Sequence, residues 1–170
     1  MGKVAHGSRA TVMRRIVVRL ALYQPDIPQN TGTILRLGAC LGVAVDIIGP
    51  AGFDMSDRAL KRAGLDYLEH AELIRHESFA AFEARRAEWG GARLVLLTSQ
   101  GSERHTEFRF AASDILLLGR ESAGVPEAVH DVCAARLRIP MRPGLRSLNI
   151  AVAAALVLGE ALRQTDGFPP

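Results

Sequence analysis

The stretch IPMRPGLRSLNIAVAAALVLGEAL, residues 139–162, joins a loop punctuated by two prolines and a glycine to a segment that is apolar on nearly every face of a helix. The loop carries Arg146, Ser147 and Asn149 to the start of that helix. Polar groups this close to a buried helix need partners, because burying them unpaired costs roughly 1–3 kcal/mol each. The partner is backbone, a second subunit or a ligand, and which of these it is decides the function.

Upstream of this stretch, runs rich in Val, Ile and Leu alternate with helical patterns. Such continuous apolar runs are typical of strands buried on both faces of a parallel sheet. Asn30 or Thr31 is expected to cap the first helix and Gly42 to end it. The order predicts one α/β domain with a mostly parallel sheet and flanking helices. The predicted strands are 16–23, 43–48, 94–98, 115–118 and 136–139; the predicted helices are 31–41, 57–63, 78–89, a short helix from Pro126, and 148–162.

Composition narrows the class of protein. The 170 residues are 48% hydrophobic and 23% charged with a net charge of +3, which indicates a globular chain that permits nucleic-acid binding without proving it. Cys40 and Cys133 lie in apolar contexts and are expected to be core thiols in a reducing cytoplasm. No apolar run reaches membrane length and no secretory signal is present. Residues 1–12 are expected to be a disordered or non-native extension, and 13–165 a single domain.

Ligands of open α/β sheets bind beyond the carboxyl ends of the strands, so the loops after Tyr23, Leu97, Leu118 and Ile139 are the candidates. The first of them lacks a Gly-x-Gly-x-x-Gly fingerprint, which argues against a dinucleotide fold. The segment 119–124 has the glycine spacing of a phosphate loop but no following Lys. The five histidines are scattered without zinc-ligand spacing and are expected at the surface.

Three motifs remain. They are PDIPQNTG (25–32) with Arg36 on the following helix, LGRESAGVP (118–126), and IPM (139–141) followed by RSLN (146–149). In this order and spacing they resemble the SPOUT methyltransferases, in their TrmH-like 2′-O-ribose branch. The resemblance covers 16–164. The short length and the stretch LKRAGLDY (60–67) are most similar to the TrmL (YibK) type, which modifies the tRNA wobble nucleotide.

The resemblance implies a C-terminal deep trefoil knot, S-adenosylmethionine as methyl donor without a metal, and a homodimer that binds tRNA in the cytoplasm. The apolar helix 148–162 supports the dimer independently, because one small sheet covers only one of its faces. The implied reaction is methylation of a ribose 2′-hydroxyl, at cytidine or modified uridine 34. S-adenosylhomocysteine is the second product.

The resemblance also assigns residues to roles. The implied catalytic residues are Asn30, Arg36, Glu121, Ser147 and Asn149. The implied cofactor-binding residues are Leu97, Thr98, Gly119, Glu121, Ile139, Met141, Ser147 and Leu148. The implied RNA contacts are Arg36, Arg142 and Arg146.

Each motif residue also has a structural interpretation. Asn30, Ser147 or Asn149 could act as a helix cap, and Glu121 could form a surface ion pair with Arg120, which stands where relatives often carry Pro. Arg stays protonated in proteins, so we expect Arg36 to clamp a phosphate and stabilise the developing alkoxide. The proton would then pass to Glu121 or to an RNA phosphate.

Three functions of different classes compete. The first is the RNA 2′-O-methyltransferase, at position 34 or at another RNA position. The second is a knotted RNA-binding protein without catalysis, against which the intact motif residues speak. The third is a small-molecule α/β enzyme, which the missing dinucleotide fingerprint disfavours.

Overall fold

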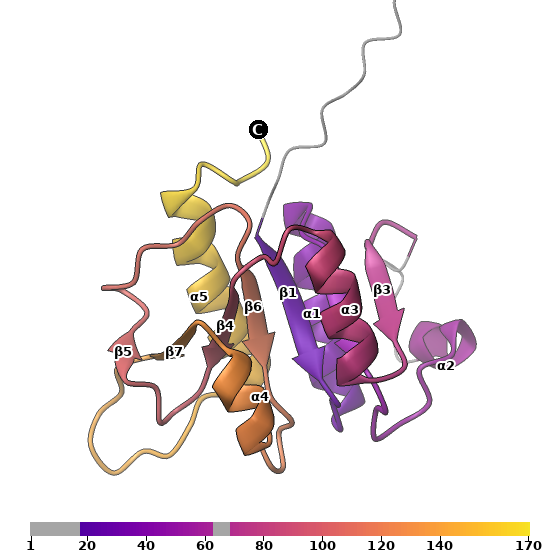
Figure 1. The fold of residues 1–170 in the computed structure, drawn as a ribbon. Coiled ribbons are helices and arrows are strands. Elements are labelled where there is room, and N and C mark those ends of the chain that lie inside the picture. The colour runs from indigo at the N-terminus through magenta and orange to yellow at the C-terminus, as the bar shows by residue number, and fades with distance from the viewer. Residues whose placement is uncertain (1–17, 63–68) are drawn as a thin grey trace, which may run out of the picture.

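A computed structural model describes residues 18–62 and 69–170 of the chain. These residues form seven strands and five helices, which alternate except where the fourth, fifth and sixth strands follow one another (Figure 1). The strands are β1 (Arg19–Tyr23), β2 (Val45–Ile48), β3 (Leu73–His76), β4 (Leu94–Leu97), β5 (Glu103–Arg104), β6 (Ile115–Leu118) and β7 (Ala135–Arg138). The helices are α1 (Pro28–Leu41), α2 (Asp57–Arg62), α3 (Phe79–Glu88), α4 (Glu127–Val132) and α5 (Ile150–Gln164).

The strands form one sheet in the order β3-β2-β1-β6-β4-β7-β5. Every strand pair in it is parallel. The α/β class and the parallel sheet predicted from the apolar runs are therefore confirmed. The strands β1, β2 and β3 extend the sheet in one direction, and β6, β4, β7 and β5 extend it in the other. The strand order therefore reverses between β1 and the strands β6 and β4, and open α/β sheets bind ligands at such a reversal.

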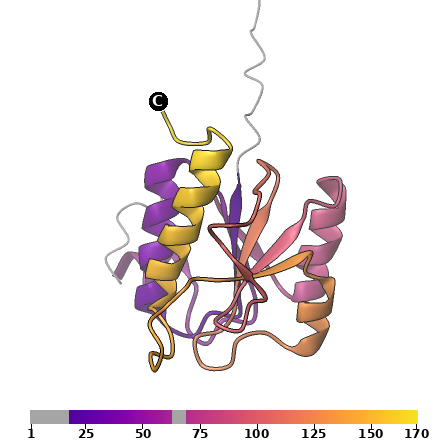
Figure 2. The same ribbon diagram turned by 90° about the vertical axis from the view of Figure 1, so that its left-hand side faces the viewer.

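Helices cover both faces of the sheet. Helices α1 and α5 lie side by side on one face, and α3 and α4 cover the other (Figures 1 and 2). Two hydrophobic clusters correspond to these faces: one joins Ile34 of α1 to Leu158 of α5, and the other joins Phe82 of α3 to Val129 of α4. Burying each large side chain of this kind contributes roughly 1.5–3 kcal/mol, so each helix is held to the sheet by its apolar stripe.

Helix α1 begins three residues earlier than 31, and the predicted Asn30 or Thr31 cap is wrong. Pro28 lies in the first turn, and the N-cap residue Ile27 makes no side-chain capping hydrogen bond. Proline needs no partner for a missing N–H and its φ suits the first turn, which explains the early start. The predicted end is confirmed, because Gly42 adopts φ 65° and donates to the Gly38 carbonyl. A left-handed C-cap of this kind favours glycine.

Strands β3 and β5 have no counterpart among the predicted strands. Each is short, and each pairs through backbone groups with a strand brought next to it by the fold. Their sequences, LIRH and ER, carry charged residues. Edge strands tolerate such residues, and tertiary pairing rather than apolar pattern creates them. The predicted extension 1–12 and the end of the predicted helix 57–63 lie outside the described residues.

The histidine expectation is wrong at two positions. His76 is 8% exposed and His105 is 9% exposed. His76 Nε2 lies 2.8 Å from Oδ1 of the fully buried Asp46, whose Oδ2 accepts from Arg19 Nε at 3.0 Å. The three side chains form a buried polar cluster whose members come from three neighbouring strands. Among the described residues no helix is long and apolar enough to cross a membrane.

Candidate active site

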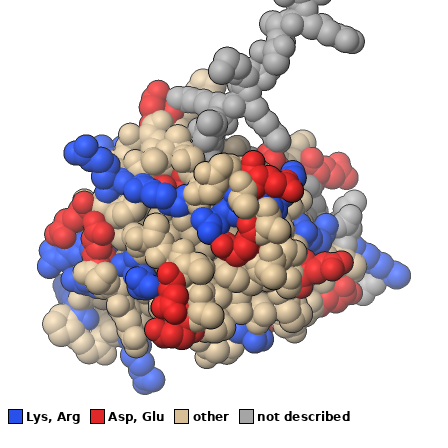
Figure 3. Space-filling view, in the orientation of Figure 1, with Lys and Arg blue, Asp and Glu red and all other residues tan. Residues whose placement is uncertain are grey.

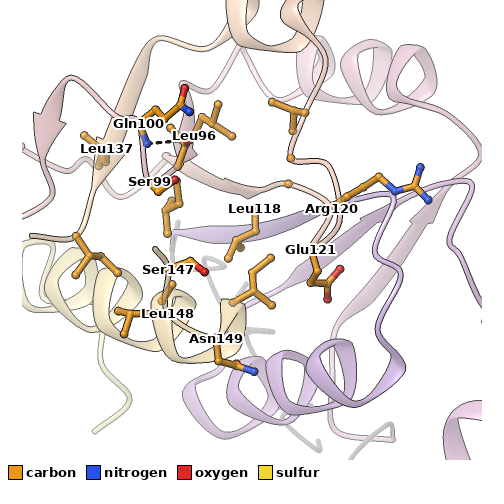
Figure 4. Close-up of a pocket in the computed structure, with 18 of the residues that line it drawn as sticks. Leu96, Ser99, Gln100, Leu118, Arg120, Glu121, Leu137, Ser147, Leu148 and Asn149 are labelled. Carbon is orange, nitrogen blue, oxygen red and sulfur yellow. Dashed lines mark hydrogen bonds between the residues drawn. The ribbon is translucent and has the colours of Figure 1, made fainter. Parts of the chain in front are cut away.

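A cavity of about 640 Å³ opens at the carboxyl ends of β4, β6 and β7 (Figure 4). Its floor is apolar, with Leu96, Leu118 and Leu137 contributed by the ends of these three strands. Its rim is polar and comes from the loops that follow β1, β4, β6 and β7, as the sheet topology predicts. A concave site of this size with an apolar floor and few polar groups suits a small organic ligand.

The loop after β6 forms one wall and is closed on itself. Arg120 N donates to Gly124 O at 2.9 Å, and Gly124 N donates to Arg120 O at 2.8 Å. Gly119 lies against this closure, since a Cβ at Gly119 would lie 2.8 Å from the Gly124 carbonyl carbon. Gly124 itself has φ 66°. Both glycines are therefore required by geometry, one for close approach and one for a left-handed backbone.

A chain of hydrogen bonds joins three segments that are distant in sequence. Asn30 Nδ2 donates to Glu121 Oε1 at 3.2 Å, and Asn149 Nδ2 donates to Asn30 Oδ1 at 2.9 Å. Asp26 N donates to Glu121 Oε2 at 3.1 Å. Both oxygens of the Glu121 carboxylate are thus held, and Figure 4 shows this carboxyl group on the same side of the cavity as Asn149.

Asp26 adds a fixed negative charge behind the wall. Hydrogen bonding with Glu121, and then with the Ser122 hydroxyl, lowers the pKa of Asp26 to about 2, and the nearby Arg120 guanidinium acts in the same direction. Desolvation opposes these effects but is smaller than the first two. The Asp26 carboxylate therefore stays ionised throughout the physiological pH range.

The loop from Ile139 to the last helix forms another part of the rim. Asn149 is the N-cap of α5, and its Oδ1 accepts from Ala151 N at 2.9 Å and from Val152 N at 3.4 Å. The same amide uses its nitrogen to reach Asn30. The capping and site interpretations of Asn149 therefore hold together, whereas Ser147 lines the cavity and the N-cap position belongs to its neighbour.

The structure brings together most of the residues singled out from the sequence. Three arginines assigned to RNA, Arg36, Arg142 and Arg146, do not line the cavity and are exposed. The predicted residues that line it are Asn30, Leu97, Thr98, Gly119, Glu121, Ile139, Met141, Ser147, Leu148 and Asn149.

Several lining residues were missed by sequence reasoning. Ser99 and Gln100 follow directly on Thr98, and Gln100 N donates to Thr98 Oγ1 at 3.3 Å. Their place after a buried strand was the available signal. His130 of α4 also lines the cavity, and no local pattern distinguishes it from a surface histidine. Asp26 was quoted within the first motif without a role. Among the described residues no group of three or more His, Cys, Asp or Glu side chains has metal-binding geometry.

Comparison with known families identifies the class of protein that carries this fold and cavity. Residues 17–159 match the model of the SpoU rRNA methylase family. The match spans most of the chain and includes all three motifs. The chain therefore belongs to the SpoU rRNA methylase family.

Relatives with assigned names cover nearly the same length. A tRNA (cytidine(34)-2′-O)-methyltransferase of Beijerinckia indica is 65% identical over 149 residues, 88% of this chain and 92% of that protein. A protein of the same name from Escherichia coli (strain K12) is 40% identical over 156 residues, 90% of this chain and 96% of the relative.

Solved structures share the fold. One, described as "Structural insights into the 2-OH methylation of C/U34 on tRNA", matches with a TM-score of 0.79 and 46% identity over 87% of this chain and 95% of that one. Another is the SpoU methyltransferase AviRb of Streptomyces viridochromogenes in complex with the cofactor AdoMet. It has a TM-score of 0.76 and 30% identity, and the match covers 90% of this chain and 62% of that one.

Proposed function

We propose that the protein transfers a methyl group from S-adenosylmethionine to the ribose 2′-hydroxyl of nucleotide 34 in tRNA. One observation carries the proposal: the Glu121–Asn30–Asn149 hydrogen-bond chain joins, at the rim of one cavity, residues 91 and 119 positions apart. Helix capping explains Asn149 alone but not its convergence with Asn30 and Glu121. Relatives of 65% and 40% identity that bear the name of this activity support the same conclusion.

The cavity fits S-adenosylmethionine. Its volume of about 640 Å³ lies within the range of pockets that enclose ligands of this size. We propose that Leu97, Ile139 and Leu148 contact the apolar parts of the molecule and that Thr98, Ser147 and backbone groups beside Gly119 and Met141 meet its polar parts. Bound there, S-adenosylmethionine supplies an electrophilic methyl group on a sulfonium.

The side chains at the rim would handle the nucleophile. Glu121 is the proposed acceptor of the 2′-hydroxyl proton, because each of its oxygens accepts one hydrogen bond, at 3.1 and 3.2 Å, and a carboxylate oxygen has room for a second. Asn30 and Asn149 hold that carboxylate in place. Arg36 is exposed on α1, and we propose that its guanidinium stabilises the developing alkoxide and binds a phosphate.

We further propose a homodimer, a knotted C-terminus and a cytoplasmic location. The exposed apolar side chains of the last helix support the dimer: Val152 is 49% exposed and Leu156 is 48% exposed on α5, and Leu145 before it is 66% exposed. An apolar face of this kind is normally covered by a partner. Membership of the family supports the knotted C-terminus, and a tRNA substrate supports the cytoplasmic location.

The proposed RNA contacts are Arg36, Arg142 and Arg146, all of which are exposed. On the face shown in Figure 3, acidic and basic side chains are interspersed. We propose that a few exposed arginines contact the phosphates of the RNA. Phosphate contacts of this type predict binding that weakens as salt rises.

The decisive test is to incubate the protein with methyl-labelled S-adenosylmethionine and total tRNA and to map the label by nuclease digestion and mass spectrometry. We expect 2′-O-methylcytidine or 2′-O-methyluridine at position 34. Label in a base would overturn the reaction class. Cofactor binding without methyl transfer to any RNA would favour a non-catalytic RNA-binding protein.

Two variants test the roles. We expect Arg36→Lys to lower the rate of methyl transfer, because a lysine cannot reproduce the planar guanidinium contact, and a full rate would refute the role of Arg36. We expect Glu121→Gln to lower the rate at saturating S-adenosylmethionine. An unchanged rate would assign the proton to an RNA phosphate instead.

A further inference from the structure

We infer that Asp26 is a positioning residue, whose side chain ties the 119–124 loop to the loop after β1 and thereby sets the affinity of the cavity for S-adenosylmethionine. This inference rests on the proposed function. It adds a residue from outside the cavity lining to the machinery of the site.

Asp26 contacts the loop after β6, where Ser122 lies 96 positions further along the chain. Oδ2 of Asp26 accepts a hydrogen bond from the Ser122 hydroxyl and lies 3.6 Å from Arg120 Nε. Its backbone N–H reaches Glu121 Oε2. Three successive residues of one loop, Arg120, Glu121 and Ser122, therefore contact a single residue of another.

Asp26 is itself held from behind. Gly52 N donates to Pro25 O at 2.8 Å, and a Cβ on Gly52 would lie 2.9 Å from Asp26 Cβ. The segment after β2 thus packs directly against Asp26. Asp26 is packed against the segment after β2 on one side and hydrogen-bonded to the 119–124 loop on the other. It can therefore hold this loop in a fixed position relative to the sheet.

The direction of Arg120 supports the same role. Figure 4 shows the Arg120 side chain pointing away from Ser147 and Leu148, and the same side chain lies close to Asp26 and Gln24. Arg120 Nη1 is 3.5 Å from Gln24 Oε1, and the Arg120 and Asp26 side chains are 35% and 19% exposed. A charge pair this shielded is screened by solvent less than a surface pair. Arg120 therefore serves as an anchor of the loop rather than as a ligand-binding group.

The loop that Asp26 holds forms a wall of the cavity. Gly119, Arg120, Glu121, Ala123 and Gly124 all line it. The Arg120–Gly124 closure holds the loop to itself, and the Asp26 contacts hold it to the rest of the protein. Without Asp26 the wall would be free to move outward, and ligand binding would then have to order it at a cost in affinity. The lowered pKa of Asp26 ensures that the charge is present at neutral pH.

The test compares Asp26→Asn, Asp26→Glu, Arg120→Met and the double variant Asp26→Asn/Arg120→Met with the wild type. Glu107→Gln is the matched control, because it removes one carboxylate from an exposed ion pair with Arg104 outside the cavity lining. The readouts are the Kd for S-adenosylmethionine by calorimetry without RNA, KM and kcat with tRNA, and amide hydrogen exchange of 119–124 in the free protein.

We expect Asp26→Asn to raise Kd and KM for S-adenosylmethionine about tenfold, within the range for coupled contacts. We expect kcat to stay within about twofold, since the lost interaction acts on binding. Asp26→Glu should restore most of the affinity, and the double variant should be no weaker than Asp26→Asn alone. Exchange in 119–124 should quicken in Asp26→Asn and not in Glu107→Gln.

Three results would overturn the inference: a fall in kcat at unchanged KM, additive losses in the double variant, or unchanged Kd and hydrogen exchange in Asp26→Asn. Failure of the proposed function has a different signature. A wild-type protein that binds S-adenosylmethionine but methylates no tRNA would remove the function, while the Kd and hydrogen-exchange comparisons would still decide the role of Asp26.

Discussion

Gly119→Ala should weaken the binding of S-adenosylmethionine by opening the loop after β6. The new Cβ would lie 2.8 Å from the Gly124 carbonyl carbon, whereas ordinary contact begins at 3.4 Å, so the loop must open by 3.4 − 2.8 = 0.6 Å. That displacement stretches the two Arg120–Gly124 hydrogen bonds of 2.9 and 2.8 Å. Overpacking of this kind costs roughly 1–3 kcal/mol.

This cost falls on the wall of the cavity and therefore on ligand affinity. It corresponds to a rise of roughly 5- to 150-fold in Kd for S-adenosylmethionine, at 1.4 kcal/mol for each factor of ten. The assay is calorimetric titration of the free protein, with thermal unfolding measured in parallel to separate affinity from stability.

Gly38→Ala provides the matched control for this prediction. A Cβ at Gly38 would lie 2.7 Å from Val43 O and from Val45 Cγ2, a clash of the same size, but Gly38 lies on α1, faces the start of β2 and does not line the cavity. We expect Gly38→Ala to lower the free energy of unfolding while Kd stays within about twofold, as for uncoupled sites. Equal Kd values for wild type and Gly119→Ala, or an equal loss in both variants, would refute the reasoning.

Three further outcomes can be measured. Asp46→Asn should lower the free energy of unfolding by about 3 kcal/mol, because the fully buried partner of Arg19 and His76 is replaced by a neutral side chain. Urea titrations followed by the fluorescence of Trp89 measure this, and a loss below about 1 kcal/mol would contradict the prediction. Cys133 is buried as expected, whereas Cys40 is exposed and the expectation of a core thiol is wrong there. Burial raises the pKa of Cys133 to about 11 and its Sγ lies 3.1 Å from Val129 O, so alkylation at pH 8 should label Cys40 and spare Cys133 until urea unfolds the chain, as peptide mass mapping would detect. The pKa of Asp26 is lowered from 3.8 to about 2, so the stabilisation by this carboxylate is present above the pKa of 3.8 in the unfolded chain and is lost as pH falls toward 2. The difference in free energy of unfolding between wild type and Asp26→Asn should therefore shrink from pH 5 to pH 3. A constant difference would count against the lowered pKa.

The apolar runs predicted the central strands because burial on both faces demands apolar residues at every position. β1, β2, β4 and β6 contain such runs and were found, whereas β3 and β5 were missed. The end of α1 was predictable because glycine at 42 is a local requirement of the left-handed C-cap. The start of α1 was not predictable, because Pro28 begins the helix earlier and the Asn30 side chain hydrogen-bonds to Glu121 instead of capping the helix.

The candidate site divides in the same way. Loops after buried parallel strands must meet at one edge of the sheet, so Thr98, Gly119 and Ile139 could be expected to line a common cavity. Which side chains bond to each other there depends on distances of a few ångströms between chain segments. His76 illustrates the point, since its sequence neighbourhood looks like a surface and only the neighbouring strand supplies buried Asp46.

The sequence by itself determined the α/β class, the parallel sheet, the loops that carry the motifs and the resemblance that led to the family. The class, the sheet and the loops follow from periodicity and turn chemistry, which act over a few residues at a time, whereas the resemblance rests on the order and spacing of the three motifs. Only the tertiary structure decided that Asn30 bonds to Glu121 and Asn149, and that Asp26 meets Arg120 and Ser122 across some 95 residues. Hydrogen bonds need their atoms within about 3 Å, and positions far apart in the chain acquire that proximity only when the sheet is assembled.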